Sequence, residues 1–177
     1  AERTGVALEL RAIADLDIES DRGVAADPSL LTTDAGAVIA RDDVDVVIEL
    51  IGGCGAAREL TLEAFRAGKS VVSANKKLLA EHGPELYEAA DAAGVDYLFE
   101  ASVGGGMPIL RSLREGLVAN HVEGMYGILN GTCNYILTKM EDEGRAFYDV
   151  LAEAQALGFA EADPTLDVDG HDTAHKA

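Results

Sequence analysis

Strand-like apolar runs alternate with segments of helical periodicity in the first half of the chain, and this alternation constrains the fold more than any other feature. The run at 44–51 is the most continuous, so we expect a strand covered on both faces. Shorter strands are predicted at 8–14, 70–73 and 95–99, and helices at 56–67 and 83–93. Parallel strands joined by crossover helices produce this pattern, so the sequence predicts an α/β fold with a doubly wound, Rossmann-type sheet.

The second half of the chain has a different pattern, which begins with a glycine cluster at 104–106. Pro108 is well placed to begin a helix that runs to residue 117. Beyond it the sequence predicts a strand at 122–129 and helices at 132–141, 146–157 and 172–177. We therefore expect a nucleotide-binding domain at 1–106 and, at 107–177, the first part of an α+β catalytic and dimerisation domain.

The predicted sheet is incomplete at its start. A dinucleotide-binding sheet normally begins with a strand and a glycine-rich turn that places the pyrophosphate at a helix N-terminus. Nothing of that kind precedes residue 8, and the helix at 172–177 runs into the last residue. We expect a chain truncated at both ends, whose nucleotide-binding domain lacks its first strand and its glycine-rich turn.

Composition disfavours two classes of function. With 14 basic and 32 acidic side chains the formal net charge is -18, which repels nucleic-acid phosphates and anionic lipid surfaces. Every apolar run is shorter than the roughly 20 residues that span a bilayer, and residues 1–4 do not begin a signal peptide. The two cysteines, Cys54 and Cys133, have no CxxC spacing and fit a reducing compartment. We expect a cytoplasmic protein that binds neither nucleic acid nor membrane.

Candidate cofactor-binding residues follow three predicted strands, at the edge where doubly wound sheets bind ligands. Gly52-Gly53 follows 44–51 and allows close backbone approach, although a plain strand-to-helix turn explains it equally well. Asp15 follows 8–14, where an acidic residue accepts hydrogen bonds from a ribose 2′-hydroxyl or, with even odds, caps a turn. No arginine follows immediately to receive a 2′-phosphate, which favours NAD. Lys76 and Lys77 follow 70–73, and we expect one of them to be functional.

The segment 161–176 has the highest density of chemically active side chains. Its acidic residues suggest a calcium loop, but alignment of Asp167 and Asp169 with positions 3 and 5 of an EF-hand puts Lys176 at position 12, where a glutamate is required. Calcium binding of that type is excluded. His171 and His175 lie four residues apart, but without the glutamate of an HExxH motif we interpret them as exposed histidines.

Asp172 and Lys176 are four residues apart and therefore share one face of a predicted helix. A surface ion pair is the simplest interpretation. Glu161, Asp163 and Asp167 precede them in one loop, however, and mutually repelling carboxylates are costly to gather unless they bind a cation. The ammonium group of an amino acid meets that need.

Several ordered motifs give the chain a resemblance to the homoserine dehydrogenase family. They are VDVVIELIGG at 44–53, AGK at 67–69 with ANKKLLA at 74–80, EASVGGGMPI at 100–109, GILNGTCNYIL at 127–137, and a stretch at 154–164. Asp167, Gly170, Asp172 and Lys176 follow at the family's spacing. Two positions depart from the family: Cys133 replaces a usual threonine, and Leu16 stands where many members carry a basic residue, which leaves the choice between NAD and NADP open.

The resemblance implies an oxidoreductase that interconverts L-homoserine and L-aspartate 4-semialdehyde with NAD or NADP, in threonine, methionine and isoleucine biosynthesis. It implies Lys176 and Lys76 as the catalytic and substrate-orienting lysines. The implied substrate-binding residues are Glu161, Asp167 and Asp172. The expected cofactor-binding residues are Lys76 and, from their positions after predicted strands, Gly52 and Asp15. The family also holds a monovalent cation, Na⁺ or K⁺, on backbone carbonyls that correspond to Glu100, Val103, Gly105 and Met107. A homodimer or homotetramer is implied for the full-length enzyme.

The chemistry of the reaction suggests how the roles divide. Lysine is ordinarily protonated at neutral pH, so we expect Lys176 to act as the acid in aldehyde reduction and Asp172 to orient and bind the substrate. Two alternatives stay open. The chain could belong to another NAD(P)-dependent dehydrogenase of similar fold, or it could be a catalytically inactive folded fragment. For the isolated chain we expect weak or absent cofactor binding.

Overall fold

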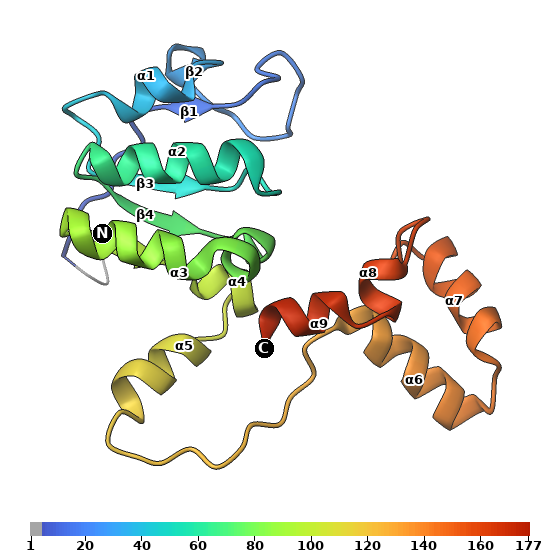
Figure 1. Ribbon diagram of the computed structural model, residues 1–177. Coiled ribbons are helices and arrows are strands. Elements are labelled where there is room, and N and C mark those ends of the chain that lie inside the picture. Colours follow the sequence, from blue (N-terminus) through green and yellow to red (C-terminus); the bar gives the residue numbers. More distant parts are fainter. Residues whose placement is uncertain (1–4) are drawn as a thin grey trace. The chain divides into compact units, whose positions relative to one another are not determined.

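The computed structural model describes residues 5–177 and divides into two compact units, Ala1–Phe99 and Glu100–Ala177 (Figure 1). The expectation that no signal peptide begins at residues 1–4 lies outside the described residues. The division falls between Phe99 and Glu100, within the last strand-to-helix connection. The functional assignment of 1–106 to nucleotide binding and of 107–177 to catalysis is not tested by this division and stays a prediction.

The first unit contains two parallel sheets. β1 (Ile13–Ala14) pairs with β2 (Leu31–Thr32), and β3 (Val46–Glu49), β4 (Ser70–Ser73) and β5 (Tyr97–Leu98) form a three-stranded sheet in that order. The short helices η1 (Pro28–Leu30) and α1 (Ala35–Ile39) flank β2. α2 (Gly55–Arg66) connects β3 to β4, and α3 (Lys76–Ala93) connects β4 to β5 (Figure 1). The predicted α/β fold with parallel strands and crossover helices is confirmed.

α3 begins earlier than the predicted helix at 83–93. The Asn75 side chain caps it by accepting a hydrogen bond from the Leu78 backbone N–H, and Gly94 ends it in the left-handed conformation at φ 67°. Pro84 therefore lies inside the helix, at a position where it removes one backbone hydrogen bond.

The helices cover one face of the three-stranded sheet. Val71 and Tyr97 are buried against Phe65 of α2 and Leu78 of α3. Side chains that alternate with these point to the opposite face, where Ile48 is 66% exposed and Leu98 is 52% exposed. The expectation that the strand at 44–51 is covered on both faces is therefore wrong for the part of the chain that the structure describes. Continuous hydrophobicity alone did not distinguish one covered face from two.

Phe65 is the largest fully buried side chain of this core, and its ring meets Tyr97 edge to face at a centroid distance of 5.4 Å. We expect Phe65→Ala to lower the free energy of unfolding by about 3–5 kcal/mol, because it removes buried apolar surface and leaves a cavity. Urea denaturation measures this. Leu98→Ala is the matched control on the exposed face and should cost less than about 1 kcal/mol; equal losses for the two variants would contradict the assignment of the core.

The predicted strands outside this sheet are shorter than expected or absent. Of residues 8–14 only Ile13–Ala14 form a strand, and Leu8 is 90% exposed. The strand expected at 122–129 is wrong: this segment has no regular structure, and Ile128 is 71% exposed. A strand needs a hydrogen-bonding neighbour, and residues 5–177 provide none for this segment.

The second unit is helical. Its elements are α4 (Glu100–Gly104), α5 (Ile109–Arg111), the π-helical turn η2 (Ser112–Gly116), α6 (Gly131–Glu143), α7 (Phe147–Ala156), α8 (Thr165–Val168) and α9 (His171–Lys176). The predicted helices at 108–117, 132–141, 146–157 and 172–177 are confirmed within a few residues at each end. Ile136 of α6 and Val150 of α7 form its small core with Ala154 and Ala160. Within residues 5–177, no helix has the length and apolar character needed to cross a membrane.

Candidate active site

The Gly52–Gly53 turn lies between the carboxyl end of β3 and the first residue of α2. Both glycines have left-handed backbone conformations, at φ 80° and 67°. A Cβ atom built on either would have no neighbour within 4 Å, so the space beside this turn is open. Glycine is the residue that adopts this conformation without strain and lets a ligand approach the backbone closely. The position and shape of the turn fit the predicted contact between Gly52 and a cofactor.

Asp15 lies directly after β1, as predicted, with its backbone N–H 3.1 Å from the Thr32 carbonyl oxygen. Its carboxylate accepts a hydrogen bond from the Asp17 backbone N–H at 2.9 Å and lies 3.5 Å from Nη2 of Arg22. Arg22 was not among the predicted site residues, because it is separated from the strand by seven residues. The structure therefore brings one cation to the position that we expect to face the ribose.

Lys76 and Lys77 begin α3, and their surroundings differ. Lys77 is exposed, and its Nζ lies 3.7 Å from Oε1 of Glu81, one helical turn further along. Such a pair is an ordinary stabilising feature of a helix surface. Lys76 is half-buried, next to the Asn75 cap. Of the two lysines, Lys76 is the one whose place fits the predicted functional role.

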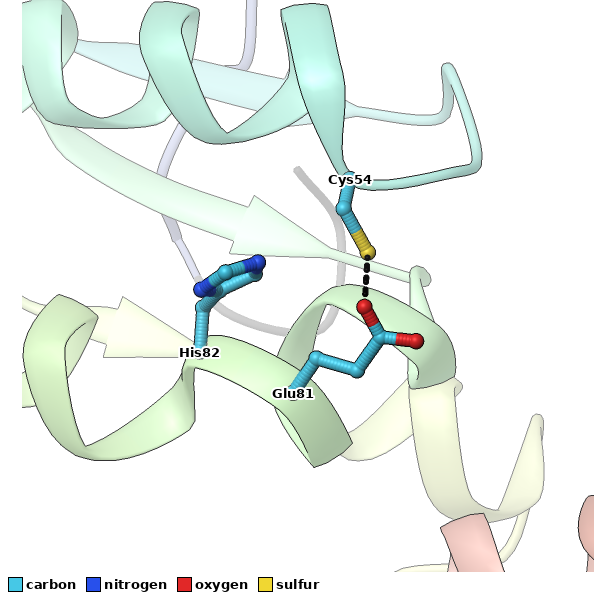
Figure 2. A group of neighbouring side chains, drawn as sticks. All are labelled: Cys54, Glu81 and His82. Atoms are coloured by element: carbon cyan, nitrogen blue, oxygen red, sulfur yellow. Dashed lines mark hydrogen bonds between the residues drawn. The ribbon is translucent and has the colours of Figure 1, made fainter.

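Cys54, Glu81 and His82 form a group of metal-ligand side chains between the start of α2 and α3 (Figure 2). Their ligand atoms lie within 4.8 Å of one another, but each of the three is already engaged. The Cys54 thiol donates a hydrogen bond to Oε2 of Glu81 at 3.2 Å, the Lys77 ammonium faces the same carboxylate, and Nδ1 of His82 lies 3.8 Å from Glu85. A metal would have to displace the thiol proton and compete with Lys77, so we assign no metal here.

Burial raises the pKa of the Cys54 thiol, and the hydrogen bond to Glu81 raises it further. Because the thiolate is the reactive form, we expect Glu81→Gln to lower this pKa and to speed alkylation of Cys54 by iodoacetamide about three- to tenfold at neutral pH. Mass spectrometry of the labelled peptides measures the rate. Cys133, which is remote in sequence and lies in the other unit, is the internal control. An unchanged rate at Cys54 would contradict the role given to Glu81.

In the second unit, Asn130 connects two of the predicted substrate-binding carboxylates. Its Nδ2 donates to Oδ1 of Asp167 at 2.7 Å and to Oδ2 of Asp172 at 2.9 Å. Its Oδ1 accepts a hydrogen bond from the Cys133 backbone N–H at 2.8 Å and so caps α6. Asn130 and Asp172 are only 7% and 5% exposed. A buried amide that uses both of its N–H donors on carboxylates fixes their positions.

Lys176 completes this group, which we call the Asn130 cluster: Asn130, Asp167, Asp172 and Lys176. Nζ of Lys176 lies 2.9 Å from Oδ2 of Asp172 and donates to the Leu129 carbonyl oxygen at 2.7 Å. The lysine side chain is 22% exposed. The predicted pairing of Asp172 with Lys176 is present, but the carboxylate is buried, so the pair is more than a surface ion pair.

The other acidic residues of the loop have different places. The Asp163 carboxylate accepts hydrogen bonds from the backbone N–H and the hydroxyl of Thr165, which lower its pKa. The Asp163 carboxylate is therefore engaged in its own turn before α8, and its predicted place among cation-binding carboxylates stays a prediction. Glu161 is exposed, and its backbone carbonyl accepts a hydrogen bond from Gln155. The structure does not bring the Glu161 side chain to the Asn130 cluster, and its predicted substrate contact stays a prediction.

Cys133, a departure from the family pattern, has a partner in this cluster. Its thiol donates to the Asp167 carbonyl oxygen at 3.1 Å, a bond that a threonine hydroxyl would also make. Burial raises the pKa of this thiol, and the nearby Asp167 and Asp172 carboxylates add to the effect. Cys133 therefore supplies a donor where we expect a threonine in the family, and its raised pKa disfavours the reactive thiolate.

The four residues predicted to hold a monovalent cation lie on α4 and just beyond it. Glu100 and Val103 are in the helix, and Gly105 and Met107 follow its end. The Met107 carbonyl oxygen accepts a hydrogen bond from the Ile109 backbone N–H at 2.9 Å, and the Glu100 carboxylate accepts from the backbone N–H groups of Leu110 and Arg111. Only Val103 and Gly105 contribute carbonyl groups near the end of the helix, where intrahelical donors are lacking, whereas Glu100 is its first residue. The site itself stays a prediction.

Comparison with known proteins agrees with this arrangement. Residues 1–100 match the family model described as "Homoserine dehydrogenase, NAD binding domain", and residues 108–177 match the model "Homoserine dehydrogenase". The homoserine dehydrogenase of Corynebacterium glutamicum is 53% identical over 178 residues, which cover 100% of this chain and 40% of that protein. That of Neisseria gonorrhoeae is 49% identical over 176 residues, with 99% and 40% covered.

Solved structures agree as well. A homoserine dehydrogenase from Thiobacillus denitrificans has a TM-score of 0.80 and 55% identity, covering 82% of this chain and 34% of that one. A hyperthermophilic archaeal homoserine dehydrogenase in complex with NADPH has a TM-score of 0.73 and 30% identity, covering 83% and 46%. The chain thus spans about 40% of the length of the curated relatives it matches.

The parallel sheet, the glycine turn at its carboxyl edge and the match to an NAD-binding domain define the class: these are features of the Rossmann-type, nicotinamide-dinucleotide-binding oxidoreductases. Within that class, the chain belongs to the homoserine dehydrogenase family.

Proposed function

We propose that these residues form the cofactor-binding and substrate-binding parts of an enzyme that interconverts L-homoserine and L-aspartate 4-semialdehyde with NAD(P). The Asn130 cluster is the observation that carries the proposal. It holds two carboxylates and one ammonium group in a small, largely buried set of side chains. The carboxylates suit the ammonium group of an amino acid, and the lysine suits the oxygen of its aldehyde or alcohol.

Lys176 has the donors that the proton transfer needs. A lysine ammonium has three N–H donors, and the acceptors found for it among residues 5–177 are the Leu129 carbonyl oxygen and Asp172. One N–H is then left for the substrate oxygen. The bound nicotinamide would supply the hydride to the aldehyde carbon, and Lys176 would give its proton to the aldehyde oxygen as that oxygen becomes a hydroxyl. The Asp172 carboxylate, which pairs with Nζ of Lys176, orients the lysine ammonium group during this transfer.

Gly52, Asp15 and Lys76 are proposed to bind the cofactor, and the charges near Asp15 favour NAD over NADP. Four carboxylates, those of Asp15, Asp17, Glu19 and Asp21, share this loop with the single cation Arg22. Arg22 is already paired, with its Nη2 3.5 Å from Asp15 and 3.8 Å from Asp17. A 2′-phosphate would face an excess of negative charge, whereas a 2′-hydroxyl can donate to Asp15.

We therefore expect the full-length enzyme to have a KM for NADP at least about tenfold higher than for NAD, a ratio that reflects this repulsion. Steady-state kinetics with the two cofactors measures it. The preference should decrease as ionic strength rises, because exposed charges are screened. A lower KM for NADP at low salt would contradict this part of the proposal.

Membership of the homoserine dehydrogenase family adds three further features to the proposal: an ion site, an oligomeric state and a cellular location. The backbone carbonyls of Glu100, Val103, Gly105 and Met107 would hold a Na⁺ or K⁺ ion. The full-length enzyme would assemble as a homodimer or homotetramer, and it would act in the cytoplasm. Of these four carbonyl groups, those of Val103 and Gly105, near the end of α4, support the first of these features.

The proposed function is tested with a full-length chimaera in which these 177 residues replace the matching segment of the Corynebacterium glutamicum relative. We expect the chimaera to reduce NAD with L-homoserine and to prefer it to L-serine and L-threonine by more than about a hundredfold in kcat/KM, since these hydroxyl groups lie on a different carbon. A preference for another amino-acid alcohol would favour a different dehydrogenase. A folded but inactive chimaera would favour a segment that has lost catalysis.

A further inference from the structure

A buried carboxylate lies beneath the Gly52–Gly53 turn and has no part in the chemistry proposed above. Glu49, the last residue of β3, is only 4% exposed. Its Oε1 accepts hydrogen bonds from the backbone N–H groups of Ile51 at 2.8 Å and Gly52 at 3.3 Å. Its Oε2 accepts from the Ser73 hydroxyl at 2.6 Å. A buried carboxylate is costly unless donors surround it, so these contacts fix both the carboxylate and the turn above it.

Asn75 extends the same network to the next residue of the turn. Its Nδ2 donates to the Gly53 carbonyl oxygen at 2.7 Å and lies 3.4 Å from Oε1 of Glu49. Asn75 is itself held, because its Oδ1 accepts from the Leu78 backbone N–H at 3.1 Å and its backbone N–H donates to the Ser73 hydroxyl at 3.0 Å. Side chains at the ends of β3 and β4 therefore hold the backbone of three successive residues, 51, 52 and 53.

The turn needs such support because nothing else in it restricts the backbone. Two consecutive glycines have more accessible conformations than any other dipeptide, and ordering them costs conformational entropy. Both are exposed, and no apolar side chain of the turn packs over them. The hydrogen bonds of Glu49 and Asn75 offset this entropy cost and order the turn in the free protein, before a ligand binds.

We propose that Glu49 and Asn75 are positioning residues that hold the Gly52–Gly53 turn in the one conformation that takes up the cofactor. This inference rests on the proposed function, which assigns the turn to the cofactor. A turn ordered in advance binds more tightly, because binding no longer has to order it. The network should therefore act on cofactor binding and leave the rate at saturation unchanged.

Two variants in the chimaera remove the two halves of the network. Asn75→Ser deletes the Nδ2 donor to the Gly53 carbonyl oxygen and to Glu49, while serine still caps α3. Glu49→Leu removes the carboxylate oxygens that accept hydrogen bonds from Ile51, Gly52 and Ser73, and the leucine side chain has a similar volume. Glu49→Gln keeps an acceptor at Oε1 and is the conservative variant that should largely restore binding. The control is Asp34→Ser. The Asp34 side chain caps α1 by accepting a hydrogen bond from the Ala37 backbone N–H, so this variant changes a helix cap away from the Gly52–Gly53 turn.

We expect Asn75→Ser and Glu49→Leu to raise the KM for NAD about ten- to a hundredfold, with kcat for L-homoserine within about twofold of the parent. Amide hydrogen exchange at Ile51 and Gly52 should become faster, since Glu49 is the acceptor of both groups. Asp34→Ser should change none of these quantities.

A KM for NAD unchanged by Asn75→Ser, or a fall in kcat alone, would overturn the positioning role while the proposed function stands. A parent chimaera that does not turn over L-homoserine would overturn the proposed function, and this inference with it. If Glu49→Leu does not fold, the contrast between Asn75→Ser and Glu49→Gln decides: equal KM values for NAD in these two variants overturn the positioning role.

Discussion

Lys176→Met in the chimaera should lower kcat for reduction of L-aspartate 4-semialdehyde by about 10²- to 10⁴-fold, the contribution typical of a positioned general acid. Methionine is close to lysine in length and preserves the packing of α9, but it has no proton to give. The KM for the cofactor should change little, because the Asn130 cluster is not the proposed cofactor site. The absorbance of the reduced nicotinamide follows the reaction.

Lys139→Met is the matched control for this variant. Lys139 lies on α6 and pairs with Glu143 one helical turn away, at the surface of the same unit. It should leave kcat unchanged. If Lys176→Met kept more than about a third of the parent rate, the assignment of the acid to Lys176 would be wrong, and Lys76 would become the candidate to test.

Asp172→Asn should lower kcat/KM for L-homoserine by about 30-fold to several thousand-fold, the range expected when one partner of a buried charge pair loses its charge. The aspartate is 5% exposed and accepts from Asn130 while its Oδ2 lies 2.9 Å from the Lys176 ammonium. An amide at this position leaves Lys176 without its counter-charge and turns a donor towards Asn130. Most of the loss should be in KM, since the carboxylate is proposed to bind the substrate ammonium group.

Asp169→Asn serves as the control for Asp172→Asn. Asp169 lies three residues earlier in the same segment, at the end of α8, and is exposed. It should change kcat/KM by less than about threefold, as surface substitutions usually do. Equal effects of the two variants would mean that the net charge of the segment, and not the buried Asp172, controls substrate binding.

Helices were predicted better than strands because their signals are local. The cap at Asn130 and the left-handed glycines Gly94 and Gly144 begin and end helices through contacts within a few residues, although the cap at Asn75 was missed and the start of α3 was predicted too late. The strand within 44–51 could also be predicted, because its neighbours follow in regular βαβ order, but the exposure of one of its faces could not. The segment 122–129 has an apolar pattern suited to a strand, but pairing depends on a partner that the local sequence does not contain.

For the Asn130 cluster, too, contacts between residues close in sequence could be predicted, and contacts between distant residues could not. Helical spacing places Asp172 and Lys176 on one face of α9, and the structure pairs them. Asn130 lies 37 residues before Asp167 and 42 before Asp172, so its part in the cluster has no local signal beyond the Asn-Gly sequence of a helix cap. The contact of the Asp163 carboxylate with Thr165, two residues further on, is local, but a count of acidic residues does not reveal it.

The most direct test of the account compares L-homoserine with 4-hydroxybutyrate, the same alcohol without its ammonium group, as substrates of the chimaera. If Asp172 and Asp167 bind that ammonium group, removing it leaves buried carboxylates without their ligand. We predict a kcat/KM for 4-hydroxybutyrate at least about 10³-fold lower, as in other sites built to bind a polar group. A value within tenfold of that for L-homoserine would contradict the role given to the Asn130 cluster.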